Sequence, residues 1–171
     1  MDRVQSASAP PTISFVDVRR YVEQEDLPSL EGWLQSGGDP NFLDERGRTL
    51  LMIVVAQDFI PAVELLICHR ADCDRQQEHG ATALALASMM GSVKCVQILL
   101  EANASLEITD ARGLSPIQYV QAKVAEYDKS GTRQGHDQSQ RKAVLALLLK
   151  HQMEIRSQGW QQSSMRIKKE Q

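Results

Sequence analysis

The chain has 171 residues, of which 42% are hydrophobic and 24% are charged, and these values exclude an intrinsically disordered chain. The formal net charge of −3 argues against a nucleic-acid-binding protein, because neutralising phosphate groups requires an excess of Lys and Arg. Aromatic residues make up only 5%, so the core must be built from aliphatic side chains, which favours packed helices.

The first segment, residues 1–12, is expected to be a disordered tail. It has no apolar stretch of the signal-peptide type. The longest apolar run, Leu50 to Ala56, is too short to cross a bilayer, so no membrane association is expected. The three cysteines form no CxxC pair, which argues against a disulfide framework and indicates a reducing compartment. We therefore expect a soluble chain in the cytoplasm, the nucleus or both.

Most of the chain repeats with a period of 33 residues. Three copies share a glycine, a hydroxyl residue two positions later and an apolar residue two positions after that. These residues are Gly47, Gly80 and Gly113, then Thr49, Thr82 and Ser115, then Leu51, Leu84 and Ile117. Each unit continues as two apolar helices separated by a break. One unit cannot bury so much apolar surface alone, so the units must stack.

Single residues predict where these helices begin and end. The hydroxyl residue of each unit is expected to cap its first helix by accepting a backbone N–H group. Gly91 suits the left-handed position that ends a first helix, and Ser92 is placed to cap the second. Asp58 occupies the left-handed position in the preceding unit. Pro61 then lies in the first turn of a second helix, where its missing N–H does no harm.

The Gly-x-Thr start, the helix pair and endings such as Arg70-Ala71-Asp72-Cys73-Asp74 resemble the ankyrin repeat. The resemblance covers residues 13–152 and implies an all-α solenoid of stacked helix-turn-helix units with short hairpin tips. It places a cap at 13–42 and repeats at 43–75, 76–108 and 109–152. The family's Thr-Pro-Leu-His motif has lost its histidine in every copy, as in Thr49-Leu50-Leu51-Met52, so we expect its Thr–His hydrogen bonds to be missing.

Residues 13–42 are interpreted as a degenerate terminal repeat. Its apolar residues Leu30, Trp33 and Leu34 stand 33 positions before Val63, Leu66 and Ile67. Trp33 is therefore expected in the core rather than in a binding site. The outer side of the cap is polar, as the end of a solenoid requires, and carries Arg19, Arg20, Glu23 and Glu25. Asp26 is expected to start the second helix of this unit.

The last repeat contains an insertion near 124–141. Residues 128–140 include no apolar side chain, so we expect a mobile loop that joins the two helices of this repeat. Such a loop is either a tolerated surface feature or part of a binding site. The remaining residues, 153–171, are expected to form a partly helical C-terminal tail. Trp160 within it is a candidate to fold back as a cap on the last repeat.

Catalytic and metal-binding arrangements are not found. The chain has no Walker loop, GxGxxG, HExxH or GxSxG motif, and its four histidines lack metal-ligand spacing. We therefore expect no enzymatic activity, no cofactor and no metal.

The resemblance to ankyrin repeats implies binding through the hairpin tips and the first helices. The tips are residues 44–48, 77–81 and 110–114, called here the first, second and third tips. Arg46, His79 and Arg112 occupy one position in successive tips, so we expect a row that meets acidic groups on a protein partner. The full set of candidate partner-binding residues is Arg46, Arg48, Gln57, His79, Met89, Met90, Arg112 and Leu114.

Three functions follow from this interpretation. The first is a monomeric adaptor or scaffold module that recruits a partner protein. The second is a small inhibitory subunit of a kinase or a transcription factor, which the size of the domain resembles. The third, an enzyme, has no specific feature behind it.

Overall fold

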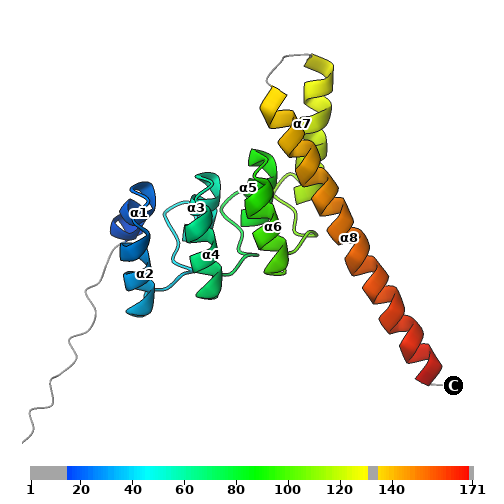
Figure 1. The fold of residues 1–171 in the computed structure, drawn as a ribbon, viewed down its shortest axis with the longest axis horizontal. Helices are drawn as coiled ribbons and strands as arrows, with labels where there is room; N and C mark the ends of the chain where they lie inside the picture. The colour runs from blue at the N-terminus through cyan, green and yellow to red at the C-terminus, as the bar shows by residue number, and fades with distance from the viewer. Residues whose placement is uncertain (1–14, 131–134, 170–171) are drawn as a thin grey trace, which may run out of the picture.

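The computed structural model describes residues 15–130 and 135–169, and in these ranges it contains eight helices and no strand. The expectation of an all-α fold is confirmed. The helices are α1 (Phe15–Glu23), α2 (Leu27–Gln35), α3 (Leu50–Ala56), α4 (Ile60–Cys68), α5 (Ala83–Met90), α6 (Val93–Glu101), α7 (Pro116–Ser130) and α8 (Gly135–Lys169). The helices form pairs that stand side by side along one axis, from α1 and α2 at one end to α7 and α8 at the other (Figure 1). The unit boundaries given above stay a prediction.

The predicted caps are present. Thr49 Oγ1 accepts a hydrogen bond from Met52 N at 3.2 Å, and Thr82 Oγ1 accepts one from Ala85 N at 3.3 Å. Gly91 ends α5 in the left-handed region with φ 81°, and Ser92 caps α6. Asp58 has φ 55°, as expected for the residue between α3 and α4. Local residue choices thus fix the starts of α3, α5 and α6 and the ends of α3 and α5.

One hydrophobic core runs through the stack from Val18 on α1 to Leu148 on α8. Leu66 and Leu99, which recur at one position of the second helices, are fully buried. Trp33 is 9% exposed and belongs to this core, as the sequence predicts. Gly38 lies against its indole ring, where an added Cβ would be too close to the ring atoms. Trp33 therefore packs the cap against the rest of the core, and the close approach of its ring requires glycine at position 38.

Backbone hydrogen bonds join neighbouring tips. Glu78 N of the second tip donates to Arg46 O of the first at 3.2 Å, and Ala111 N of the third donates to His79 O at 3.0 Å. Gln76 adds a side-chain bond from Nε2 to Thr109 O at 2.9 Å. These bonds hold the tips at a fixed spacing, so residues at one tip position form a row on one edge of the molecule.

The prediction of a loop over 128–140 is wrong for most of its length. Helix α7 runs to Ser130 and α8 begins at Gly135, while residues 131–134 lie outside the described structure. The absence of apolar residues does not prevent a helix, because Lys and Gln, which occur in this segment, are good helix formers. Polar composition alone therefore does not distinguish a loop from a helix.

The C-terminal segment also differs from the expectation. Helix α8 continues as one helix to Lys169 and projects beyond the stack (Figure 1). Its backbone does not fold back over the last repeat, so the expected C-terminal cap is wrong. The Trp160 side chain lies outside the described part of the structure.

Candidate functional site

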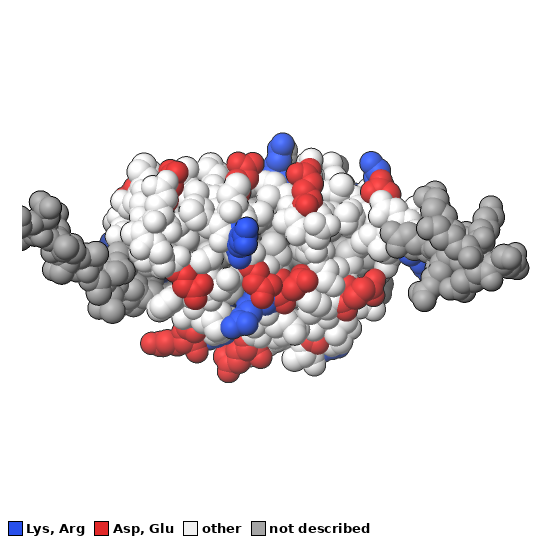
Figure 2. Space-filling view, turned by 90° about the horizontal axis from the view of Figure 1, so that it is seen from below, with Lys and Arg blue, Asp and Glu red and all other residues white. Residues whose placement is uncertain are grey.

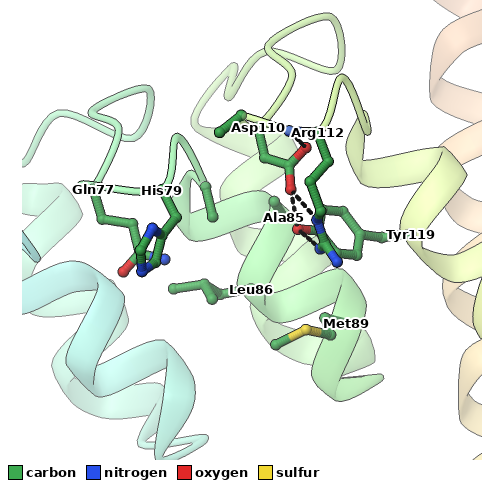
Figure 3. Close-up of a pocket in the computed structure, with 10 residues that line it drawn as sticks. Gln77, His79, Ala85, Leu86, Met89, Asp110, Arg112 and Tyr119 are labelled. Carbon is green, nitrogen blue, oxygen red and sulfur yellow. Dashed lines mark hydrogen bonds and ion pairs between the residues drawn. The ribbon is translucent and has the colours of Figure 1, made fainter.

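A hollow of about 330 Å³ lies between the second tip, the third tip and α5 (Figure 3). We call it the α5 hollow. Its lining residues are Gln77, His79, Ala81, Ala85, Leu86, Met89, Asp110, Ala111, Arg112 and Tyr119. The α5 side of this hollow is apolar, because α5 contributes only Ala85, Leu86 and Met89 to the lining. Polar groups come from the tips, so the hollow combines an apolar floor with a polar rim.

A buried carboxylate organises the third tip. Asp110 Oδ1 accepts hydrogen bonds from the backbone N–H groups of Arg112 and Leu114, each at 2.9 Å. Asp110 Oδ2 accepts from Tyr119 Oη at 2.6 Å and from Arg112 Nε at 2.9 Å. The hydrogen bond from Tyr119, followed by those from Leu114 and Arg112, outweighs desolvation and holds the pKa of Asp110 well below its usual range. The side chain is 4% exposed, so this network is shielded from water.

The Arg112 guanidinium group is fixed by the same network. It lies 5.2 Å from the centre of the Tyr119 ring, and its Nη2 donates to Tyr119 Oη at 2.5 Å. Its hydrogen bond to Asp110 raises the pKa of Arg112. Burial, followed by the hydrogen bond to Asp110, raises the pKa of Tyr119. The side chain of Arg112 is still 66% exposed, so it presents a preoriented but already paired cation at the rim.

The first tip repeats this arrangement. Asp44 Oδ1 accepts from the backbone N–H groups of Arg46 and Arg48, and its Oδ2 accepts from Arg48 Nε at 2.7 Å. Desolvation raises the pKa of Asp44, but the hydrogen bonds from Arg48 and Arg46 outweigh it and lower the pKa overall. In the second tip the equivalent residue is Gln77. The middle of the row therefore lacks the internal carboxylate, and Gln77 lines the hollow instead.

Sequence reasoning missed Asp44, Asp110 and Tyr119. The signal was present for the carboxylates, because Asp44, Gln77 and Asp110 are spaced by the same 33 residues as the glycines. Tyr119 carries no such signal. Its partnership with Asp110, nine residues away, depends on side-chain directions that spacing does not specify.

The predicted row of side chains is present on successive tips, but fewer of the cationic side chains at the tips are without an ion pair than expected. Arg46, His79 and Arg112 stand on successive tips joined by backbone hydrogen bonds. Arg48 and Arg112 are paired with Asp44 and Asp110. Among the residues that the structure describes, Arg46 has no side-chain hydrogen bond or ion pair, and it is exposed.

The structure separates the two methionines that the sequence analysis grouped. Met89 lines the α5 hollow, whereas Met90 is 49% exposed and lines a different depression with Val55, Asp58 and Gly91. Successive residues of a helix point about 100° apart, which explains the split. Leu114 is half-buried against the hollow's apolar side, while Gln57 is the exposed C-cap residue of α3 and does not line it.

On the side of the molecule seen from below Figure 1, uncharged residues cover most of the surface, and the charged side chains scattered over it are more often Asp or Glu than Lys or Arg (Figure 2). These carboxylates repel negatively charged groups locally, since like charges disfavour encounter.

Metal ligands and the thiol groups of Cys73 and Cys95 give no alternative site in the part of the chain that is described. No group of three or more His, Cys, Asp or Glu residues is arranged to hold a metal there. Burial, with nearby aspartates, raises the pKa of Cys73 to about 11, and burial likewise raises that of Cys95 to about 11, so both thiols are protonated at neutral pH. None of the described helices has the length and apolar character needed to cross a membrane.

Comparison with known proteins gives a consistent set of similarities. A family model for ankyrin repeats (3 copies) matches residues 20–110. The chain is 34% identical over 104 residues, 60% of its length, to neurogenic locus notch homolog protein 1 of Xenopus laevis. It is 37% identical over 83 residues, 46% of its length, to ankyrin repeat domain-containing protein 63 of Mus musculus.

A third relative is the 2-5A-dependent ribonuclease of Homo sapiens, with 37% identity over 76 residues, 44% of this chain. The matched regions make up 4%, 21% and 10% of these three relatives. The chain therefore spans at most about a fifth of the length of the proteins it matches.

Proposed function

This chain belongs to the ankyrin-repeat family, whose repeats are protein-interaction modules, and on that premise we propose that it is an adaptor or scaffold that binds a partner protein at the α5 hollow and the adjoining tips. The proposal includes a location in the cytoplasm or nucleus and binding without turnover.

The α5 hollow is the observation that carries the proposal. Interfaces gain most of their affinity where an apolar side chain enters a preformed, desolvated pocket surrounded by polar groups. Leu86 and Met89 supply apolar contact there, and the flexible thioether of Met89 adapts to the shape of an inserted side chain. The hydrogen bonds of Asp110 hold the third tip in place before binding, which lowers the entropic cost of association.

The expected charge of the partner follows from the arginine side chains of the tips that have no ion pair within the described ranges. Reversing Arg112 to Glu would place a second carboxylate beside Asp110 and break the third tip, so it does not test recognition cleanly. Among the described residues Arg46 has no internal partner, so it is the better probe of an acidic surface on the partner protein. Because it is exposed, Arg46→Glu should mainly slow association and weaken its salt dependence.

Adjacent methionines provide the matched test. The partner is identified by affinity purification with mass spectrometry, and its dissociation is then followed from Met89→Ala and Met90→Ala variants. We expect dissociation from Met89→Ala to be roughly tenfold faster, since a buried interface contact is lost, and dissociation from Met90→Ala to be unchanged. Equal effects of the two substitutions, or none from either, would contradict binding at the α5 hollow.

A further inference from the structure

The N-terminal end of the stack contains a second hollow, bounded by α1 and the first tip. Its lining residues are Arg19, Arg20, Glu23, Leu43, Asp44, Glu45, Arg46 and Arg48. We call it the α1 hollow. Four guanidinium groups thus come from two elements separated by α2, in a chain whose net charge is negative.

Two of the four arginines are neutralised within the chain. Arg19 Nε lies 2.7 Å from Glu23 Oε1, and Arg48 Nε lies 2.7 Å from Asp44 Oδ2. The pair with Asp44 is the more buried, with the carboxylate side chain 9% exposed, and it holds the wall of the first tip. These two ion pairs form part of the lining of the hollow, and their charges are not available to bind a ligand.

The other two arginines are available. Arg20 and Arg46 are exposed, and within the described ranges neither guanidinium group has a hydrogen bond or an ion pair. The only carboxylate of the lining without an ion pair in those ranges is Glu45, so the free groups are positive in excess. Guanidinium groups bind carboxylate and phosphate oxygens through paired N–H donors, which suits them to recognise anionic side chains.

The hollow also has an apolar component. Leu43 lines it and is 39% exposed, so an apolar side chain of a ligand has a surface to contact. The hollow is continuous with the tip row, because Arg46 belongs to the first tip and its carbonyl group is bonded to Glu78 N of the second. A chain lying along the tips can therefore reach both hollows.

We infer that the α1 hollow binds an acidic segment of the partner protein, with Arg20 and Arg46 contacting carboxylate or phosphate groups and Leu43 contacting an adjacent apolar side chain. This inference rests on the proposed function, since it assigns the chemistry of the partner that the tips recognise. It adds Arg20 and Leu43, which the tip row does not include.

Three synthetic peptides test the chemistry. The first has a leucine flanked by glutamates and serines, the second replaces the glutamates by glutamine, and the third carries phosphoserine in place of serine with glutamine in place of glutamate. Binding is followed by fluorescence anisotropy at two salt concentrations. The glutamate or phosphoserine peptide, or both, should bind and the glutamine peptide should not. Binding by only one of the two anionic peptides identifies carboxylate or phosphate as the source.

Matched variants locate the site on the chain. The double variant Arg20→Gln/Arg46→Gln should weaken binding about tenfold, as expected for two exposed charge pairs, and remove most of the salt dependence. Lys142→Gln/Arg156→Gln on α8 also removes two positive charges at exposed positions and should leave binding unchanged. The inference is overturned if the glutamine peptide binds as well as the acidic ones, or if the double variant binds like the unmodified chain.

Measurements of binding to the identified partner distinguish failure of this inference from failure of the proposed function. Loss of partner binding in Met89→Ala but not in the double arginine variant would overturn the inference and leave the proposed function standing. Unchanged binding in both variants would overturn both.

Discussion

Ser88 lies within α5 and is fully buried, and its hydroxyl oxygen has no hydrogen-bond partner among the described residues. Burying an unpaired hydroxyl group costs free energy that an alanine at the same position would not incur. We expect Ser88→Ala to raise the free energy of unfolding by about 1 kcal/mol, measured by urea denaturation.

Ser92 provides the control for this measurement. Its hydroxyl group accepts a hydrogen bond from Cys95 N and caps α6, so Ser92→Ala should destabilise the chain by about 1 kcal/mol. If Ser88→Ala were as destabilising as Ser92→Ala, the hydroxyl group of Ser88 would have a partner after all.

Asp110 should make stability depend on pH in the acid range. Its pKa is lowered in the folded chain by hydrogen bonds from Tyr119, Leu114 and Arg112, whereas in the unfolded chain it is about 3.9. The stabilising contribution is therefore fully present above the unfolded pKa and is lost as the pH falls through and below it. Above that pKa, Asp110→Asn should be clearly less stable than the unmodified chain. Unfolding measurements from pH 7 to pH 2.5 should show this difference shrinking with acidification, and a constant difference would contradict the network.

At the scale of single elements, the tips depend on glycine to different degrees. Gly80 and Gly113 both have positive φ, 79° and 75°, so alanine at either position strains the backbone by about 1 kcal/mol. At Gly80 the added Cβ would also lie 2.9 Å from Ala111 N, whereas at Gly113 it would meet nothing within 4 Å.

Gly80→Ala should therefore be the more destabilising of the two substitutions, because it also pushes the second and third tips apart. Since the α5 hollow lies between those tips, Gly80→Ala should also weaken partner binding, and Gly113→Ala should not. Thermal unfolding and the affinity for the identified partner check both statements. Equal losses of stability in the two variants would show that the second and third tips can move apart at position 80 without a cost in free energy of unfolding.

The elements also show what sequence could predict. The 33-residue period predicts the stack, and Leu66 and Leu99, which stand one period apart, are both fully buried in it because burial of one helix face repeats with the unit. Thr49, Thr82 and Ser92 predicted helix starts through one local hydrogen bond each. The polar residues at the end of α7 and the start of α8 are helical and not a loop, since composition does not specify backbone conformation.

The candidate site was less predictable than the fold for a physical reason. Tip positions follow from the repeat, so the row of Arg46, His79 and Arg112 could be anticipated. The pairing of Arg112 with Asp110 and Tyr119, and the separation of Met89 from Met90, depend on side-chain directions. Repeat spacing does not carry that information.

At the scale of the whole molecule, the backbone hydrogen bonds between neighbouring tips place the α1 and α5 hollows along one row. A partner with acidic groups would be attracted toward this row by Arg20 and Arg46, which have no ion pair among the described residues, and this attraction orients its approach.

Site-specific photo-crosslinking tests this account most directly. A photoreactive amino acid is placed at Met89 in the α5 hollow or at Glu64, an exposed position on α4, and each chain is irradiated in cell extract. The covalently captured proteins are identified by mass spectrometry. The account predicts one dominant protein captured from position 89, displaced by excess unmodified chain, and not captured from position 64. Capture of that protein from position 64 but not from position 89 would place binding at α4 rather than at the α5 hollow and contradict the proposed function.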